Sequence, residues 1–135
     1  MNQEELQMHD LNQRMENSKV SIVKAIFPGT TNHYDTLFGG TAMLWMDEVA
    51  FISATRFSKK RVVTVSTDRI DFKHPIPAGT IVELIAKVTK VGRSSLTVNV
   101  QLYLEKMYEE YRKLALEGNF SFVAIDQNKQ TCAII

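Results

Sequence analysis

The segment from Thr41 to about Phe57 constrains the fold of this chain more than any other stretch. It contains no proline or glycine, and its apolar side chains fall on every side of the helix that it would form. A helix that is apolar all round is normally buried, because none of its faces suits water. The rest of the chain must therefore surround one central helix with apolar surface.

The segments around this helix carry the two-residue period of β-strands. We expect strands at about 20–27, 63–72, 82–88, 95–104 and 114–124. Within 63–72 the apolar phase switches near residues 66–69, which predicts a β-bulge inside one long strand. Strands joined by short turns pair antiparallel. The pattern therefore predicts an α+β fold in which an antiparallel sheet curls around the helix.

The chain of 135 residues fits a single domain. We place that domain at residues 18–126, after a polar lead-in at 1–17 that is loose or briefly helical, and before a tail at 127–135 without a clear pattern. One helix cannot cover five strands of this length completely. We therefore expect another subunit to bury part of the sheet or one of its edges.

Composition excludes several classes of function. The formal net charge of +1 gives no overall basic field of the kind that nucleic-acid binders carry. The single cysteine, Cys132, excludes a disulfide framework and a cysteine-based zinc site, and it favours a reducing compartment. The N-terminus lacks the apolar core of a signal peptide, and the apolar run 37–54 carries two carboxylates and is too short to span a bilayer. We expect a cytoplasmic protein that binds neither membrane nor nucleic acid.

The central helix contains a charge that needs an explanation. Asp47 follows the pair Gly39-Gly40 by two helical turns and lies inside the apolar run. A buried carboxylate is costly unless something uses it. Spacing alone leaves two interpretations open: a functional group, or a structural carboxylate that caps a loop or pairs with a cation. Glu48 points about 100° away from Asp47 around the helix, so we assign it to solvent or an interface.

Three segments resemble the acyl-CoA hydrolase (acyl-CoA thioesterase) family of the hotdog fold. They are TNHYDTLFGGTAMLWMDEVAFISATRF (31–57), RVVTVSTDRIDFKHPIPAG (61–79) and KVGRSSLTVNV (90–100), and the resemblance extends over roughly 19–126. It implies a sheet wrapped around one long helix, a homodimer with active sites at the subunit interface, and larger assemblies such as a hexamer built as a trimer of dimers.

The resemblance also implies roles for particular residues. Asp47 and Asn32 match the catalytic pair of the family, which comes from opposite subunits, and the backbone amides of Gly39 and Gly40 match those that face the thioester carbonyl. The family often has glycine where this chain has Asp35. Aspartate can replace glycine in a left-handed loop conformation. The alternative is that Asp35 alters the entrance to the site or the substrate range. In both cases we expect the activity to be retained.

The implied chemistry is hydrolysis of acyl-CoA to a carboxylic acid and coenzyme A. Free N–H groups at a helix N-terminus suit the oxyanion of the tetrahedral intermediate. Asp47 would act as a general base or as a nucleophile, and sequence leaves both routes open. Asn32 would orient the water or hold the carbonyl. No metal or separate cofactor is expected, because coenzyme A belongs to the substrate.

The resemblance places the coenzyme A contacts at the turn made of Gly92, Arg93, Ser94 and Ser95. A second candidate is the basic run Lys59-Lys60-Arg61, which is otherwise an ordinary solvated helix end. Arginine matches phosphate geometry well. We predict Arg61 and Arg93 as phosphate partners and leave the two lysines open.

Two other functions share this fold. The first is a non-catalytic acyl-CoA sensor, although about 20 residues before the first strand are too few for a helix-turn-helix unit. The second is an acyl-thioester hydratase or dehydratase, whose pattern has a catalytic histidine on or near the helix. No histidine lies between His33 and His74. We interpret those two as a loop residue and a structural residue.

Overall fold

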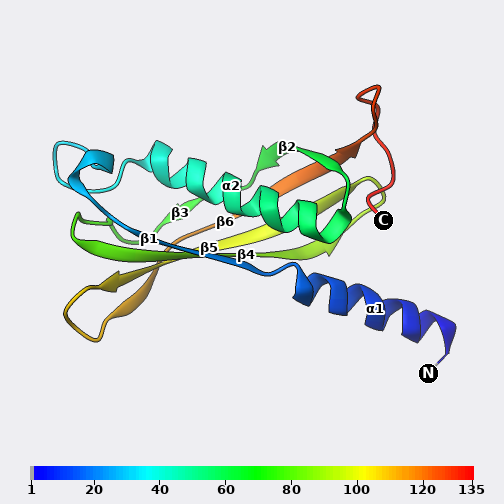
Figure 1. Ribbon diagram of the computed structural model, residues 1–135, viewed down its shortest axis with the longest axis horizontal. Coiled ribbons are helices and arrows are strands. Elements are labelled where there is room, and N and C mark those ends of the chain that lie inside the picture. Colours follow the sequence, from blue (N-terminus) through cyan, green and yellow to red (C-terminus); the bar gives the residue numbers. More distant parts are fainter. Residues whose placement is uncertain (1) are drawn as a thin grey trace.

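A computed structural model describes residues 2–135. Its elements are α1 (Gln3–Asn17), β1 (Val20–Ala25), a 3-10 turn η1 (Pro28–Thr30), α2 (Gly39–Ser58), β2 (Arg61–Thr67), β3 (Asp71–Phe72), β4 (Thr80–Val91), β5 (Ser95–Lys106) and β6 (Arg112–Ile125). Helix α2 lies along one face of the sheet, and α1 projects from the end at which α2 finishes (Figure 1). The predicted α+β class is confirmed.

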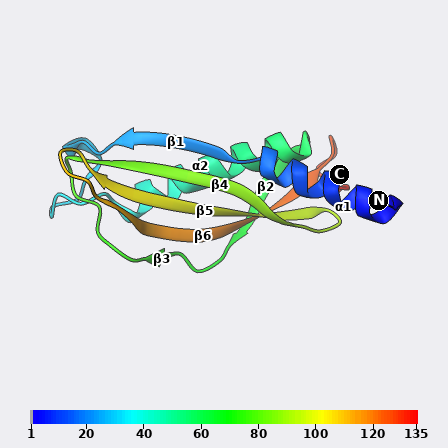
Figure 2. The same ribbon diagram turned by 90° about the horizontal axis from the view of Figure 1, so that it is seen from below.

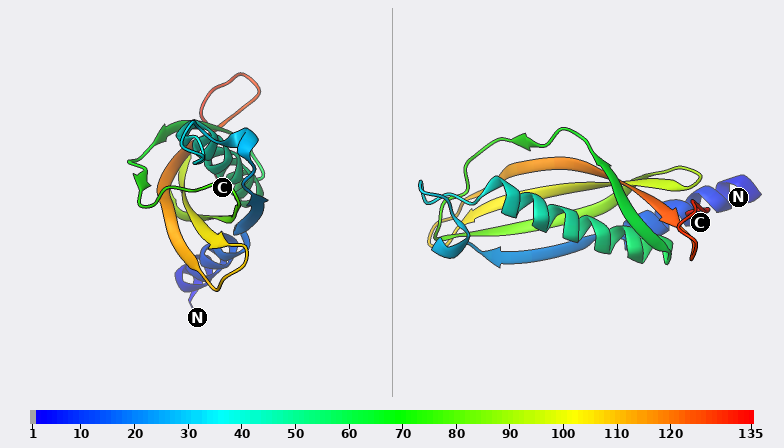
Figure 3. Two further views of the ribbon diagram at one scale, coloured as in Figure 1. Left: turned by 90° about the vertical axis from the view of Figure 1, so that its left-hand side faces the viewer. Right: turned by 90° about the horizontal axis from the view of Figure 1, so that it is seen from above.

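All strand pairs of the sheet are antiparallel. The strand order is β1-β4-β5-β6-β2, and the short β3 also pairs with β6. The strands lie side by side in Figure 2, and the end view in Figure 3 shows the sheet curling around α2. The buried residues of β5 are those that the alternation predicts: Leu96, Val98, Val100, Leu102 and Leu104. The sheet is therefore a curved layer whose concave, apolar face holds the helix.

The strand expected at 63–72 is divided in the structure. A register shift between Thr64 and Ser66 confirms the predicted bulge, slightly earlier in the chain than expected. Residues 68–70 then belong to neither strand, although the Asp68 N–H still donates to the Asn119 carbonyl of β6 at 2.9 Å. The expectation of one continuous strand is therefore wrong: β2 and β3 are separate strands that pair with different parts of β6.

Helix α2 buries only one of its faces within a single chain. Buried residues along this face include Ala42, Met46, Val49, Ala50 and Ala54. An adjoining stripe of the helix exposes Met43, Leu44 and Phe51, with exposed fractions of 39%, 62% and 45%. A single chain therefore does not enclose α2 on all sides, in contrast to what the sequence predicted, because its sheet covers only one side of the helix.

The two ends of the chain are more structured than their sequences indicate. Helix α1 has 15 residues, none of them buried, and begins with a capping box in which Asn2 and Glu5 bond each other's backbone N–H. Ser18 is buried just after it, where its hydroxyl oxygen accepts from the Val88 N–H and its carbonyl accepts from the Ser53 hydroxyl. The tail at 127–135 returns to the body through the fully buried Ile134. Among residues 2–135, no helix is long and apolar enough to cross a membrane.

Candidate active site

The start of α2 offers free backbone donors. Gly39 is the first helical residue, as predicted, and the preceding Phe38 forms no side-chain cap. The first N–H groups of a helix have no partner inside it, and they carry the positive end of the helix dipole. A Cβ on Gly40 would meet nothing within 4 Å, whereas one on Gly39 would lie 3.6 Å from the Phe72 ring. The helix start is therefore open to an anionic oxygen on the side of Gly40.

Asn32 organises the loop that leads into this helix. Its Oδ1 accepts three hydrogen bonds, from the Tyr34 N–H at 2.9 Å, the Thr36 N–H at 3.2 Å and the Thr36 hydroxyl at 3.0 Å. Because a backbone N–H can only donate, these bonds fix which end of the amide is oxygen. Within residues 2–135, Asn32 Nδ2 has no acceptor in hydrogen-bond range, so its N–H groups are available to a ligand. The Oδ1 atom is already occupied by the three hydrogen bonds that it accepts.

The same loop contains Asp35, at the position where the family often has glycine. Asp35 has a φ of 60°, in the left-handed region that favours glycine. Its carbonyl accepts from the Ala78 N–H at 2.8 Å, which ties the loop to the segment before β4. The expectation that Asp35 occupies a left-handed position is confirmed.

Asp47 lies in the middle of α2 and is half-buried. Its Oδ1 accepts a hydrogen bond of 2.9 Å from the hydroxyl of Thr64 on β2. In the described part of the chain, no lysine, arginine or histidine forms an ion pair with it. The structure thus offers no cation that would make Asp47 a structural ion-pair partner, and Oδ2 is left without a protein partner.

Thr64 is the functional candidate that sequence reasoning missed. In the sequence it is one polar residue between two valines of a strand, a position typical of a solvated face. Only the path of β2 beside α2 reveals that its hydroxyl meets Asp47. The one sequence signal that could have indicated it is a threonine in the first strand after a helix that contains an unexplained carboxylate.

The predicted coenzyme A contacts lie at the far end of α2 from the glycine pair (Figure 1). Arg61 begins β2 and is exposed, as is Arg93 in the turn between β4 and β5. The turn is fixed by backbone hydrogen bonds from the Gly92 N–H to the Ser95 carbonyl at 2.7 Å and from the Ile134 N–H to the Arg93 carbonyl at 2.9 Å. One chain therefore gathers Asn32 and the glycines at one end and the two arginines at the other, with Asp47 between them.

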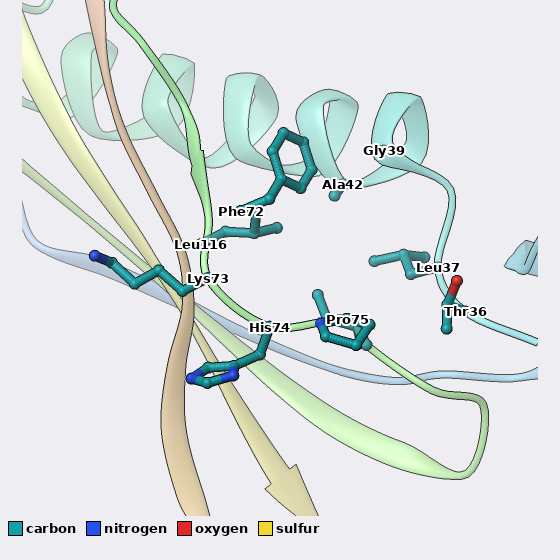
Figure 4. A pocket seen from close by; sticks show the side chains of 10 residues that line it. Thr36, Leu37, Gly39, Ala42, Phe72, Lys73, His74, Pro75 and Leu116 are labelled. Atoms are coloured by element: carbon teal, nitrogen blue, oxygen red, sulfur yellow. The ribbon is translucent and has the colours of Figure 1, made fainter.

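A cavity of about 360 Å³ opens beside the helix start. It lies between α2 and the segment from Phe72 to Ile76, and Leu116 of β6 also lines it (Figure 4). His74 and His33 are both exposed, and His74 points away from the helix in Figure 4. Among the described residues, no group of three or more His, Cys, Asp or Glu side chains is placed to hold a metal ion.

Comparisons with known proteins agree with this architecture. Residues 34–111 match the model of the Thioesterase superfamily. The chain is 41% identical over 111 residues to the uncharacterized acyl-CoA thioester hydrolase YkhA of Bacillus subtilis, covering 82% of this chain and 64% of that protein, which is less than two thirds of its length. It is 36% identical over 107 residues to an uncharacterized acyl-CoA thioester hydrolase of Zymomonas mobilis, covering 79% of this chain and 72% of the relative.

A solved structure extends the comparison to three dimensions. The acyl-CoA hydrolase of Staphylococcus aureus, solved in complex with butyryl coenzyme A and coenzyme A, superposes with a TM-score of 0.84 at 38% identity, covering 88% of this chain and 73% of that one. The chain therefore belongs to the thioesterase superfamily, and its sheet wrapped around α2 is the hotdog fold.

Further structures of the S. aureus hydrolase carry an alanine in place of a threonine, an aspartate or an asparagine. The three replaced residues are separated along that chain by the same numbers of residues as Asn32, Asp47 and Thr64 are here. The spacing matches Asn32 of the loop before α2 together with Asp47 and Thr64, the two residues that a hydrogen bond joins here.

Proposed function

We propose that this protein is an acyl-CoA thioesterase, which hydrolyses acyl-CoA to a carboxylic acid and free coenzyme A. The observation that carries the proposal is the state of Asp47. This carboxylate is half-buried on the central helix, is held on one oxygen by Thr64, and has no cation beside it in residues 2–135. The other oxygen is free to meet water or substrate, and relatives named acyl-CoA thioester hydrolases support this function.

Two chemical routes fit this geometry. As a general base, Asp47 takes a proton from water while the water oxygen bonds to the thioester carbon, and the resulting oxyanion is stabilised by N–H groups at a helix start. The C–S bond then breaks, and the coenzyme A sulfur leaves with the proton. As a nucleophile, the carboxylate displaces the thiolate and forms a mixed anhydride that water cleaves. Asn32 contributes N–H donors to the carbonyl or to the water oxygen, and neither route needs a metal or a separate cofactor.

The active site of this proposal is shared by two subunits, with a homodimer as the minimal active unit. Asp47 lies eight residues after Gly39, about 12 Å along the helix axis. A general base must lie within about 3 Å of its target or reach it through one water. Asp47 is therefore too far from its own helix start and is proposed to serve the helix start of a partner.

The surface around Asp47 supports the same assembly. Met43, Leu44 and Phe51 leave an apolar face on α2, and exposed apolar patches mark interaction sites. A hexameric acyl-CoA thioesterase superposes on this chain with a TM-score of 0.85 at 32% identity, covering 88% of this chain and 76% of the other. We extend the proposal to a hexamer composed of three dimers.

The proposal assigns Arg61 and the Gly92–Ser95 turn to the coenzyme A moiety. If two α2 helices pack antiparallel around a two-fold axis, the arginine end of one chain faces the glycine pair of its partner. Arginine would then bind phosphate at one end of the substrate while the thioester meets the helix start at the other. A cytoplasmic location, where acyl-CoA is available, completes the proposal.

The test is release of free thiol from a panel of acyl-CoAs, with wild type and Asp47→Asn measured side by side. Asparagine keeps the shape of aspartate and can still accept the Thr64 hydrogen bond, so the variant should fold. Loss of an acid–base group typically costs 10²–10⁴-fold, and we expect kcat to fall within that range. A folded Asp47→Asn protein with wild-type turnover would exclude the proposed role, and no turnover with any chain length would favour the sensor function.

A further inference from the structure

The C-terminal tail at 127–135 has no assigned role, although it is bonded to two segments of the proposed coenzyme A site. We propose that the peptide unit between Ala133 and Ile134 holds Lys60 and Arg93 in place for the phosphates of coenzyme A. The buried side chain of Ile134 anchors this unit. The inference rests on the proposed thioesterase function and adds to it a positioning residue, Ile134, and a phosphate contact, Lys60.

One peptide unit of the tail joins the two segments directly. The Ala133 carbonyl accepts a hydrogen bond of 3.0 Å from Lys60 Nζ, in the connection between α2 and β2. The N–H of the same unit belongs to Ile134 and donates to the Arg93 carbonyl at 2.9 Å. In Figures 1 and 3 the tail lies beside the β4–β5 turn and the end of α2. A displacement of this unit would therefore disturb both basic residues.

The tail completes the hydrogen bonding of the β4–β5 turn. The carbonyls of its central residues, Arg93 and Ser94, accept from the N–H groups of Ile134 and Ala124, both at 2.9 Å. Ala124 belongs to β6, so the carbonyl that depends on the tail is that of Arg93. A fixed backbone reduces the conformational entropy that phosphate binding would otherwise remove from the turn. The tail thus acts on Arg93 through the backbone of the turn.

Ile134 has the burial that an anchor needs. Its side chain is 0% exposed and belongs to the hydrophobic core, whereas the neighbouring Ile135 is 54% exposed. Two residues before it, the Cys132 N–H donates to the Ala124 carbonyl at 3.0 Å, so the tail runs back along the end of β6. Truncation of a buried isoleucine to alanine removes most of its apolar contacts. Ile134→Ala should therefore loosen the tail at the point where it bonds to the turn.

The two basic side chains are available to an anion. Within residues 2–135, neither Lys60 nor Arg93 forms an ion pair with a carboxylate, and both residues are exposed. The Lys60 ammonium has three N–H donors and gives one to the Ala133 carbonyl, so two remain for phosphate oxygens. Lys59 instead lines a separate hollow next to Arg14 of α1. Of the two lysines that the sequence left open, the tail contact therefore favours Lys60.

The test compares two substrates that share the reacting thioester. Acyl-CoA carries the phosphates, whereas acyl-pantetheine with the same acyl chain lacks them. In Ile134→Ala we expect KM for acyl-CoA to rise about tenfold, the effect of losing one hydrogen bond to a charged group. The kcat for acyl-CoA and the kcat/KM for acyl-pantetheine should equal those of wild type. Lys60→Met should give the same pattern, because it removes both the ammonium and its bond to the tail.

Two further variants are controls. Ile135→Ala makes the same truncation at the neighbouring exposed position and should behave as wild type. Ile134→Val refills most of the buried volume and should bring KM for acyl-CoA close to the wild-type value. Lys60→Met changes an exposed residue and leaves the core intact, so the test does not depend on the stability of Ile134→Ala. Thermal unfolding and size-exclusion chromatography show whether each variant keeps its fold and assembly.

Two results would overturn the inference. An equal rise in KM for both substrates would show that Ile134 has only a general structural role, and an unchanged KM for acyl-CoA in Ile134→Ala and Lys60→Met would show that it has none in phosphate binding. Calorimetry with free coenzyme A and with pantetheine separates the inference from the reaction. A higher Kd for coenzyme A alone in both variants supports the inference even without turnover, whereas wild-type turnover with an unchanged Kd in both variants supports the thioesterase and removes the positioning role.

Discussion

The hydroxyl of Thr64 donates a hydrogen bond of 2.9 Å to Oδ1 of Asp47, linking the edge strand β2 to the central helix. The bond holds the carboxylate in one orientation, and within residues 2–135 no hydrogen bond reaches Oδ2. Because the bulge lies between Thr64 and Ser66, it shapes β2 next to the residue that makes this contact. Thr64 is thus a positioning residue for the group proposed to act on the thioester.

Replacing Thr64 by valine tests this relationship. Thr64→Val keeps the branched shape but removes the donor, and a hydrogen bond to a charged group is worth about 1.5 kcal/mol or more, roughly tenfold in rate. We expect kcat to fall about that much with KM little changed, and Thr64→Ser to restore it. If Thr64→Val turned over acyl-CoA at the wild-type rate, the hydrogen bond would have no role in positioning Asp47.

Asn32 offers a sharper test because its two functions involve different atoms. Asn32→Asp keeps an oxygen for the N–H groups of Tyr34 and Thr36, so the loop should stay folded. It removes the Nδ2 donors, and loss of one such donor at a reacting oxygen typically costs about 10²-fold or more. We expect Asn32→Asp to retain the wild-type Tm and lose turnover, while Asn32→Ala loses both. An active Asn32→Asp enzyme would show that only the loop needs this residue.

The left-handed conformation of Asp35 leads to a prediction about stability. A β-branched residue at a φ of 60° is strained by about 1–2 kcal/mol, so Asp35→Val should lower the free energy of unfolding by that amount. Asp35→Gly should cost little, because glycine adopts this conformation freely. Urea denaturation measures both variants against wild type. Equal stability of Asp35→Val and Asp35→Gly would contradict the assigned conformation.

Acid sensitivity should arise in part at Glu83. The hydrogen bond from the Ser21 hydroxyl, followed by that from the Arg112 guanidinium, lowers the pKa of Glu83 below its ordinary value of 4.5. A carboxyl group whose pKa is lower in the folded than in the unfolded state stabilises the fold at pH values above its unfolded pKa. This stabilisation is lost as the pH falls through the folded pKa. Wild type should therefore be more stable than Glu83→Gln at pH 7, and the difference should shrink below about pH 4.5.

Denaturation curves at several pH values check this prediction, with Glu109→Gln as the control. Glu109 pairs with Lys106 on an exposed hairpin, where such pairs add little. If the stability difference between wild type and Glu83→Gln stayed constant from pH 7 to pH 3, Glu83 would not contribute to the acid sensitivity of the protein.

The sequence was sufficient for the parts of the fold that depend on strong periodicity. The all-round apolar helix and the unbroken alternation of 95–104 predicted α2, β5 and the antiparallel sheet, and the resemblance of three segments to a known family predicted the hotdog fold. Contacts between distant segments could not be predicted in the same way. Thr64 meets Asp47 only because of the path of β2, and Ile134 is buried although the tail around it has no pattern.

The length of α1 was underestimated for a related reason. No residue of α1 is buried, so the apolar period that identifies a packed helix is weak there, and local capping by Asn2 and Glu5 defines its start instead. The exposed apolar face of α2 shows the converse: the sequence indicated burial on every side, but one chain supplies only one of the surfaces that this requires.

Subunit complementation tests the central proposal most directly. Asp47→Asn and Asn32→Asp, each expected to be inactive, are co-expressed with different tags, and mixed assemblies are isolated and assayed for thiol release. If the two residues act from opposite subunits of a two-fold dimer, each mixed dimer has one site with both native residues and should recover about half of the wild-type rate. Mixed assemblies as inactive as their parents would contradict a site shared between subunits.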